Sequence, residues 1–233
     1  MPARDEAPRL RAAVLDVLDA AGRQFARYEL IIVNDGSVDE TAEIADALAL
    51  ELPCIRVIHL AAPQGLGGAF KQGLCSATLE YVSVAHGDGG TPPQELVKIW
   101  SLRGQADLIV PYILNTTQRP AHRVLVSRSF VWLVNSLFDI QVRYHLHYVL
   151  YHRQLIQSVR LRTNSHAFQA EALIKLLRRG HSFVEIGVND DFVGQAPTRS
   201  YSLANVLRVA LFFLWTLYDV YLAPTVTAKR DPR

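Results

Sequence analysis

The sequence predicts an α/β fold in which helices cover both faces of an open, mostly parallel sheet. Helical segments alternate with short apolar runs through the first half of the chain, which is the pattern of such a sheet. The run over residues 28–33 is apolar nearly throughout, as expected of a strand buried on both faces. The length of 233 residues fits one globular domain with a small appendage.

The composition excludes several classes of protein. Half of the residues are apolar, 20% are charged and the mean hydropathy is +0.11, which excludes a disordered chain, a coiled coil and a collagen-like protein. The net charge of +2 is too small a basic excess for a dedicated nucleic-acid-binding protein. With only two cysteines, Cys54 and Cys75, a disulfide framework is not expected. Residues 1–5 are polar and do not resemble the start of a signal peptide. We therefore expect a cytoplasmic protein.

The first half of the chain supplies most of the predicted sheet. In residues 8–24 the apolar side chains recur at helical spacing, so this segment is expected to be an amphipathic helix. Further helices are expected at residues 37–50 and 65–77 and from Pro92 onward, because proline is tolerated in a first helical turn. The strands are expected at residues 28–33, 55–60, 80–85 and 107–110.

The second half is less regular. Helices are expected at residues 124–138 and 166–179, and a strand at residues 183–188. A last helix over residues 203–222 is strongly apolar, so we place a boundary after residue 202, between an α/β domain, 1–202, and an apolar helix with a basic tail, 203–233. The chain opens on a helix, whereas a parallel α/β sheet normally opens with a strand. We therefore expect the sheet to lack a first, central strand.

Two acidic turns follow predicted strands. They are Asn34-Asp35-Gly36-Ser37 and His86-Gly87-Asp88-Gly89, at the sheet edge where open parallel sheets bind ligands. Asp35 could accept hydrogen bonds from a base or ribose, and Asp88 could hold a divalent cation between two phosphates. Alternatively, both aspartates only close turns. The glycine-rich turn at residues 64–69 could let the backbone approach a phosphate, although tight helix packing explains it equally.

Together these segments resemble family 2 glycosyltransferases. Residues 28–41 resemble the family's nucleotide-binding block, EIIVVDDGSxDxT, and residues 1–6 resemble the tail of its opening motif, PAYNEE. Residues 64–73 resemble the motif NxGxGxAxxxG, and residues 86–93 resemble DADxQxPP. Within that family the chain is similar to dolichol-phosphate mannosyltransferase-type enzymes. Arg123 and Ser127 fit their RxxxS segment, residues 168–173 fit FQxELL, and residues 185–188 resemble EVPV.

The resemblance implies a GT-A fold that binds a nucleotide-diphosphate sugar with Mg²⁺ or Mn²⁺. The sugar would pass, with inversion, to a polyprenyl phosphate at the cytoplasmic face of a membrane. Asp88 would bind the metal and face the pyrophosphate, while Arg123 and Ser127 would hold the acceptor phosphate and act with Asp88 in catalysis. The nucleotide would contact Pro2, Ala3, Glu6, Asp35, Gly67 and Lys71.

The chain also departs from the family pattern. His86 stands where the first Asp of D-x-D is expected, and Gly90 where a metal-binding Gln often lies. Histidine is a poor ligand for Mg²⁺ but an acceptable one for Mn²⁺. Residues 192–199 correspond to a loop in which the family carries basic residues, and here only Arg199 is basic. We expect Arg199 and Glu171 to lie on the side of the site that binds the acceptor. These changes leave a non-catalytic protein that binds a nucleotide or a partner as the alternative.

A hydroxyl acceptor is a further alternative. Such a reaction would require a carboxylate base, for which Glu171 or Asp190 are the candidates. The histidines at 145, 147 and 152 could suggest a metal site, but no Cys or carboxylate accompanies them, so a packing role is favoured.

The last helix is expected to lie in a membrane interface. Its apolar run over residues 206–218 is shorter than the roughly 20 residues that a membrane span requires. Trp215, Tyr218 and Tyr221 would lie at headgroup depth, with Lys229, Arg230 and Arg233 on anionic lipid. Alternatively, the last helix is buried against the sheet or against a partner chain. In the second case the protein would be a homo- or hetero-oligomer.

Overall fold

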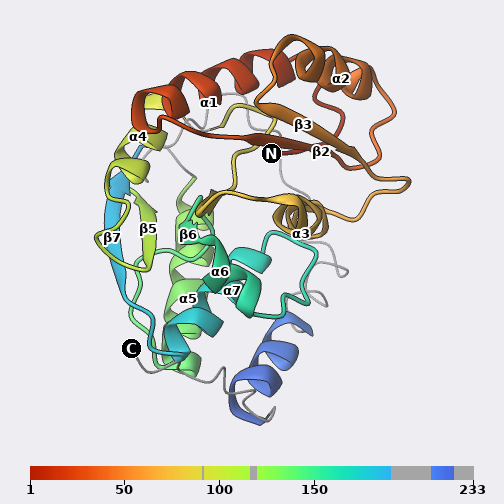
Figure 1. The fold of residues 1–233 in the computed structure, drawn as a ribbon. Coiled ribbons are helices and arrows are strands. Elements are labelled where there is room, and N and C mark those ends of the chain that lie inside the picture. The colour runs from red at the N-terminus through yellow and green to blue at the C-terminus, as the bar shows by residue number, and fades with distance from the viewer. Residues whose placement is uncertain (91, 116–119, 190–210, 223–233) are drawn as a thin grey trace.

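The computed structural model describes residues 1–90, 92–115, 120–189 and 211–222 (Figure 1). Its first sheet has the order β1-β2-β3 and is parallel throughout, with Pro2 opposite Val33 and Leu30 opposite Ile55. These strands are β1 (Pro2–Ala3), β2 (Leu30–Asn34) and β3 (Ile55–His59). Every residue of β2 is buried, which confirms the prediction of a buried strand from the apolar run over residues 28–33.

Helices cover both faces of this first sheet. On one face lies α1 (Leu10–Gln24), which buries its apolar stripe against the side chains of Leu30 and Ile32, together with α2 (Thr41–Glu51). On the other face lies α3 (Leu66–Ser76), whose Ala69 packs with Ile31 and Val33. Alternate residues of β2 therefore contact opposite helical layers, as the period of two in a strand requires.

The second sheet has the order β4-β6-β5-β7. Its strands are β4 (Tyr81–Ser83), β5 (Leu108–Ile113), β6 (Leu150–His152) and β7 (Phe183–Val188). Strand β6 is antiparallel to both neighbours, whereas β5 and β7 are parallel. The sequence analysis did not predict β6, because three residues are too short to show a period of two.

The remaining helices surround the second sheet. They are α4 (Pro93–Ser101), α5 (Ala121–Phe138), α6 (Arg153–Ser158) and α7 (Phe168–Arg178), followed by a helix over residues 211–217 that continues into η2 (Tyr218–Leu222). Nine consecutive residues of α7 are buried, so this helix lies in the core (Figure 1). The predicted α/β fold with a mostly parallel sheet is confirmed. The boundary after residue 202 lies outside the described residues and stays a prediction.

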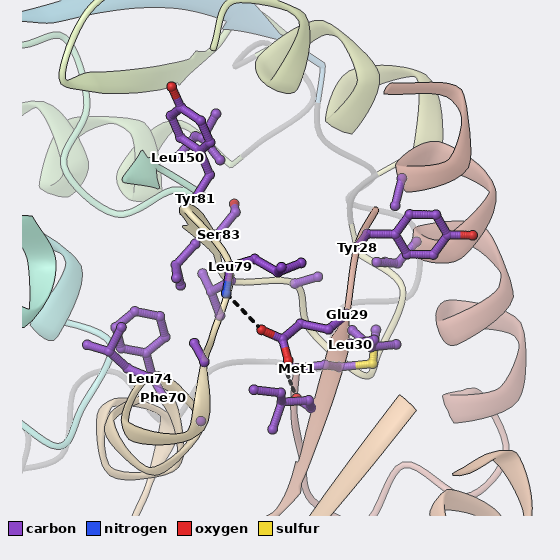
Figure 2. A pocket seen from close by; sticks show the side chains of 18 of the residues that line it. Met1, Tyr28, Glu29, Leu30, Phe70, Leu74, Leu79, Tyr81, Ser83 and Leu150 are labelled. Atoms are coloured by element: carbon purple, nitrogen blue, oxygen red, sulfur yellow. Dashed lines mark hydrogen bonds between the residues drawn. The ribbon is translucent and has the colours of Figure 1, made fainter. Parts of the chain in front are cut away.

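The first strand differs from expectation. Instead of being absent, it persists as β1, whose two residues pair with β2. The two sheets are joined at their carboxyl ends, where the Gly87 N–H donates to the Pro2 carbonyl at 3.2 Å. Toward their amino ends a cavity separates β2 from β4 (Figure 2).

Candidate active site

The two acidic turns meet the N-terminal segment at the carboxyl edge of the strands. The Asp35 N–H donates to the Ala3 carbonyl at 2.9 Å, and Glu6 N–H donates to Thr41 Oγ1 at 2.8 Å. A Cβ on Gly87 would lie 3.0 Å from the Ala3 Cβ, so glycine relieves a tight contact at this close approach. The fold thus brings Asp35 and Asp88 to one sheet edge, as predicted from the turn positions, and Pro2, Ala3 and Glu6, which the family resemblance indicated, lie beside them.

Asp35 is buried and holds the glycine-rich turn. Its Oδ1 accepts the Gln64 N–H at 2.6 Å, and its Oδ2 accepts the Gly65 N–H at 2.9 Å. Gly65 has φ +83°, a left-handed conformation that favours glycine. A carboxylate offers about four lone-pair sites, two on each oxygen. On each Asp35 oxygen, one lone pair therefore binds the backbone at the start of α3, and the second is left for a ligand.

Asp88 and His86 occupy the turn after β4. Asp88 is exposed, and its Oδ1 accepts the Gly90 N–H at 3.1 Å. The His86 Nε2 atom is buried and has no hydrogen-bond partner among the described residues. Burial lowers the pKa of His86 to about 4, so the ring is neutral at pH 7 and its unprotonated nitrogen can bind a metal.

Glu6 and His166 lie near this turn. The pKa of Glu6 is raised, chiefly by burial and then by the negative charge of Asp88. The ring of His166 lies 6.2 Å from the ring of His86, between centroids. Tyr148 packs edge-on against His86 at 5.0 Å. Aromatic rings therefore surround His86 while Asp88 faces solvent.

The donor set fits a divalent cation in part. Asp88 supplies oxygen and His86 an unpartnered nitrogen, a pair that suits Mn²⁺ better than Mg²⁺. Across the part of the chain that the structure describes, no group of three or more His, Cys, Asp or Glu side chains converges on one point. If Asp88 and His86 bind a cation, phosphate oxygens and water must therefore complete the coordination, as is usual for cations bound with nucleotides.

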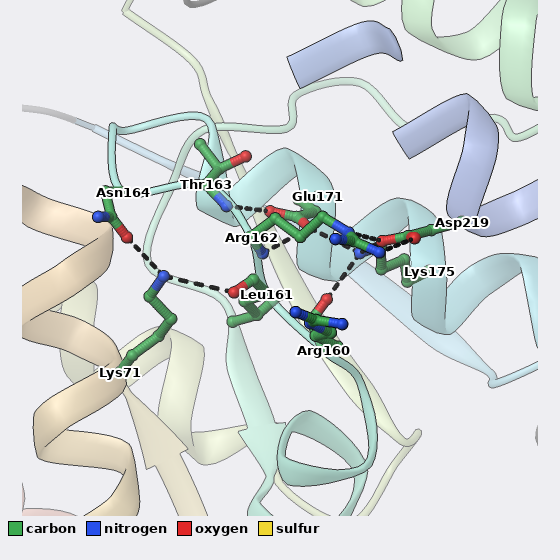
Figure 3. Close-up of polar contacts among 9 residues, drawn as sticks. All are labelled: Lys71, Arg160, Leu161, Arg162, Thr163, Asn164, Glu171, Lys175 and Asp219. Carbon is green, nitrogen blue, oxygen red and sulfur yellow. Dashed lines mark hydrogen bonds and ion pairs between the residues drawn. The ribbon is translucent and has the colours of Figure 1, made fainter. Parts of the chain in front are cut away.

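Gly67 and Lys71 contact the loop before α7, and Figure 3 shows the contacts of Lys71. Gly67 N–H donates to the Asn164 carbonyl at 2.8 Å, and a Cβ on Gly67 would lie 2.6 Å from the Thr163 carbonyl oxygen. Lys71 Nζ donates to the Leu161 carbonyl at 3.3 Å and to Asn164 Oδ1. Burial lowers the pKa of Lys71. The glycine-rich turn and the loop over residues 160–164 therefore form one unit.

That loop is held by a buried cluster of charges, which we call the Glu171 cluster: Arg162, Glu171, Lys175 and Asp219 (Figure 3). Glu171 accepts the backbone N–H groups of Arg162 and Thr163 at 2.9 and 2.8 Å. Lys175 Nζ lies 2.6 Å from Glu171 Oε1 and 2.7 Å from Asp219 Oδ2. Glu171 is 1% exposed and is therefore shielded from solvent.

Asp219 connects the C-terminal helix to this cluster. Arg162 donates to both Asp219 oxygens at 2.8 Å, and these bonds, followed by that from Lys175, lower the pKa of Asp219 to about 2. The sequence analysis missed Lys175 and Asp219. The i, i+4 spacing of Glu171 and Lys175 is a signal that could have found half of the cluster.

The predicted acceptor residues are only partly described. Arg123 and Ser127 both belong to α5, with Ser127 one helical turn after Arg123. Arg199 and Asp190 lie outside the described residues.

The histidines singled out from the sequence do not gather around a metal. His145 is 1% exposed and its Nε2 lies 3.1 Å from Asn135 Oδ1. His152 instead faces Glu80 at 3.6 Å. Within the described ranges, no group of three or more His, Cys, Asp or Glu side chains converges here.

Buried basic groups predict that the chain loses stability in acid. Burial lowers the pKa of the Met1 amine to about 5, from 8.0, and the pKa values of His86 and His145 to about 4, from 6.5. Between these values the unfolded chain binds the protons, so the free energy of unfolding falls by a few kcal/mol as the pH falls from 8 to 4. Urea unfolding at several pH values measures this.

The variant His145→Phe provides the control for that prediction. It removes one of the groups that titrate between pH 6.5 and 4, so it should reduce the slope of the free energy of unfolding in that range, while the slope above pH 6.5 is unchanged. A free energy of unfolding that rises as the pH falls through this range would contradict the assignment of these buried groups.

Residues 1–154 match the sequence profile described as "Glycosyl transferase family 2". This chain belongs to that family. The match includes both acidic turns, the glycine-rich turn and α5. The fold is also similar to that of glucosyl-3-phosphoglycerate synthase from Mycobacterium tuberculosis, which has been solved with uridine diphosphate. The two structures superpose with a TM-score of 0.69 at 18% identity, and the match covers 92% of this chain and 78% of that one. The same enzyme has been solved with Mn²⁺, UDP-glucose and phosphoglyceric acid, at a TM-score of 0.67 and 16% identity.

Curated relatives come from several kingdoms. Polyprenol monophosphomannose synthase of Mycolicibacterium smegmatis is 27% identical over 179 residues, which are 70% of this chain and 66% of that protein. Dolichyl-phosphate beta-glucosyltransferase of Homo sapiens is 30% identical over 106 residues, which are 42% of this chain and 33% of that protein. The chain thus spans less than two thirds of the length of these relatives.

Proposed function

We propose that this chain is an inverting glycosyltransferase that moves a sugar from a nucleotide-diphosphate donor to a polyprenyl phosphate. The observation that carries the proposal is the junction at the sheet edge, where the Asp35 turn, the glycine-rich turn and the turn with His86 and Asp88 come together. Family membership and relatives named for polyprenol and dolichyl phosphates support this choice of acceptor.

The donor would lie along this edge. The nucleoside would contact Pro2, Ala3, Glu6 and Asp35, and the glycine-rich turn with Gly67 and Lys71 would flank it. Asp88 and His86 would hold Mn²⁺, or less well Mg²⁺. The metal, when bound, offsets the negative charge that develops on the departing diphosphate.

In the transfer itself, an oxygen of the acceptor phosphate attacks the anomeric carbon from the face opposite the diphosphate. One C–O bond forms as the C–O bond to the diphosphate breaks, so the configuration inverts. The phosphate oxygen is already anionic, so no strong general base is needed. Arg123 and Ser127 would hold this phosphate through charge-assisted hydrogen bonds, with Arg199 as a further basic contact.

A hydroxyl acceptor is less consistent with the site. Such an acceptor requires a base that can take a proton, and Glu171 is buried with three protein donors on its two oxygens. We therefore propose that Glu171 positions the loop over residues 160–164 rather than acting as a base. This loop in turn supports the donor site through Gly67 and Lys71.

The test is a transfer assay with labelled nucleotide sugars, Mn²⁺ and polyprenyl phosphate in anionic vesicles, with phosphoglyceric acid as a competing acceptor. The expected product is a glycosyl lipid phosphate with inverted configuration. Product on phosphoglyceric acid alone would replace the lipid acceptor. Absence of any product from protein that binds the nucleotide would favour the non-catalytic alternative.

His86 sets the metal preference in this proposal. The variant His86→Asp supplies a second carboxylate oxygen in place of nitrogen, so we expect the activity with Mg²⁺ to rise relative to that with Mn²⁺ by roughly tenfold. The ratio of rates with the two metals measures this. An unchanged ratio would mean that His86 does not contact the metal.

We also propose that the protein binds peripherally to the cytoplasmic face of a membrane. No helix within the described residues is long and apolar enough to cross a bilayer. The helix over residues 211–222 packs beside α5, where Phe130 contacts Phe212 and Tyr221 Oη donates to the Leu137 carbonyl at 2.8 Å. Both helices carry large exposed apolar side chains: Leu125, Val126 and Trp132 on α5, and Leu211, Leu214, Trp215, Tyr218, Tyr221 and Leu222 on the other.

Exposed aromatic residues of this kind suit a lipid interface. We expect Trp132→Glu and Leu214→Glu each to weaken binding to anionic vesicles by about tenfold or more, since each side chain contributes about 1.5–3 kcal/mol when buried. Vesicle co-sedimentation measures the binding. Leu50→Glu, at a side chain 90% exposed on α2, is the matched control and should bind normally. Equal binding by all three variants would contradict the proposed lipid-facing surface.

A further inference from the structure

The C-terminal helix over residues 211–222 is bonded directly to the loop over residues 160–164 (Figure 3). The Arg162 guanidinium donates to both Asp219 oxygens at 2.8 Å, and it lies 5.1 Å from the centroid of the Trp215 ring. Trp215 and Asp219 stand at positions i and i+4 of this helix, so one helix holds Arg162 by an ion pair and by a cation–π contact. Trp215 is 49% exposed and belongs to the surface proposed to face lipid.

The same loop contacts the donor side of the site. The Asn164 carbonyl accepts the Gly67 N–H at 2.8 Å. The contact is tight, since a Cβ on Gly65 would lie 2.8 Å from this carbonyl oxygen. The Gly65 N–H donates in turn to Asp35 Oδ2 at 2.9 Å. A continuous series of contacts therefore runs from the C-terminal helix, through the loop and the glycine-rich turn, to Asp35.

The charges of the Glu171 cluster make the positions of the helix and the loop depend on each other. The cluster pairs two cations, Arg162 and Lys175, with two carboxylates, and Asp219 is its member from the C-terminal helix. If the helix moved away, Asp219 would leave with it, and both cations would share Glu171. Lys175 is 7% exposed, and unbalanced charge in so buried a place is strongly disfavoured. The loop is thus held in place while the helix is docked.

Lipid would favour this docked state for two reasons. The surface proposed to face lipid is shared by α5 and the C-terminal helix, so a membrane contacts both only while they are packed together. Burial of Trp215 in the interface also removes water beside the pair of Arg162 and Asp219, whose side chains are 26% and 11% exposed. A lower dielectric strengthens their attraction. Lipid therefore differs in its affinity for the two states, as a shift in their populations requires.

We propose, on the basis of the function proposed above, that Arg162 and Asp219 are positioning residues that couple membrane binding to nucleotide binding. Arg162 acts through the backbone of its loop, which supports the glycine-rich turn beside the donor. Because coupling between two binding sites is reciprocal, lipid strengthens the binding of the nucleotide, and the nucleotide strengthens the binding to lipid by the same factor.

The test measures the dissociation constants of UDP and GDP with Mn²⁺, in the presence and absence of vesicles of equal parts phosphatidylcholine and phosphatidylglycerol. These vesicles contain no polyprenyl phosphate, so the acceptor does not contribute. We expect the nucleotide that binds to do so about fivefold or more tightly with vesicles present. The nucleotide should strengthen co-sedimentation with vesicles by the same factor, and this second measurement needs no variant.

The variant Arg162→Gln keeps the backbone of the loop but removes the charge. It should abolish the effect of vesicles, so that the dissociation constants with and without vesicles become equal. Arg178→Gln is the matched control, because Arg178 contacts the same helix, at 5.5 Å from the centroid of the Tyr221 ring, while its ion pair is with Asp139 at 3.6 Å. This control should keep the full effect of vesicles.

A purely structural role of Arg162 would weaken nucleotide binding equally with and without vesicles. Arg162→Gln with the same ratio of dissociation constants as the unchanged protein would therefore overturn the coupling. Equal dissociation constants with and without vesicles in the unchanged protein, which nevertheless binds both ligands, would overturn the coupling alone. Failure of the unchanged protein to bind vesicles or any nucleotide would instead contradict the proposed function, and the coupling with it.

Discussion

Replacing Lys175 with Met is expected to lower the free energy of unfolding by about 3–5 kcal/mol. The Lys175 ammonium is 7% exposed and lies within 2.7 Å of carboxylate oxygens of both Glu171 and Asp219. Its removal leaves Glu171 buried without its counter-charge, which costs far more than the loss of an exposed pair. Denaturant unfolding followed by circular dichroism measures the change.

The control for this prediction is Arg23→Met. Arg23 forms an i, i+4 pair with Asp19 at 2.6 Å, with side chains 61% and 52% exposed, so its loss should cost less than about 1 kcal/mol. Equal losses in the two variants would contradict the account of the Glu171 cluster as a buried support. The Lys175 variant should also weaken nucleotide binding, because the loop over residues 160–164 contacts Gly67 and Lys71.

Replacing Asp88 with Asn is expected to reduce sugar transfer by about 100–1000-fold, the range found when a group that stabilises developing charge is removed. The amide cannot supply the negative oxygen that a divalent cation prefers. Asp88 is exposed, so the fold should be unaffected, and the loss should appear in both the rate and the metal-dependent part of nucleotide binding. Initial rates at saturating donor measure it.

Asp16→Asn, at an exposed position on α1, is the matched control and should keep full activity. Transfer by Asp88→Asn at the rate of this control would remove Asp88 from the metal site and the catalytic step. A melting temperature equal to that of the unchanged protein would show that any loss is chemical rather than structural.

Much of the fold could be predicted from the sequence because most of its helices and strands have a recognisable pattern within their own residues. The apolar run that became β2 and the helical period of α1 needed no distant partner to be interpreted. Strand β6 could not be predicted, since its three residues become a strand only through pairing with β4 and β5. Tertiary pairing of this kind leaves no periodic trace in so short a segment.

The candidate site was predicted to a similar extent. The rule that ligands bind at carboxyl ends of strands placed Asp35 and Asp88 at the edge where the structure has them. The sequence analysis could not predict which hydrogen bonds each carboxylate makes. Asp35 holds the backbone of the Gly65 turn. Glu171 accepts the N–H groups of a loop, and Lys175 connects it to Asp219, which is 48 positions away along the chain.

The most direct measurement is a calorimetric titration of the protein with UDP, GDP and their sugar conjugates, each with Mn²⁺, with Mg²⁺ and with EDTA. We expect one nucleotide to bind tightly with Mn²⁺, more weakly with Mg²⁺ and least in EDTA, and we expect Asp88→Asn to lose this dependence. Binding of no nucleotide by a folded sample, under any of the three conditions, would contradict the donor site at this sheet edge.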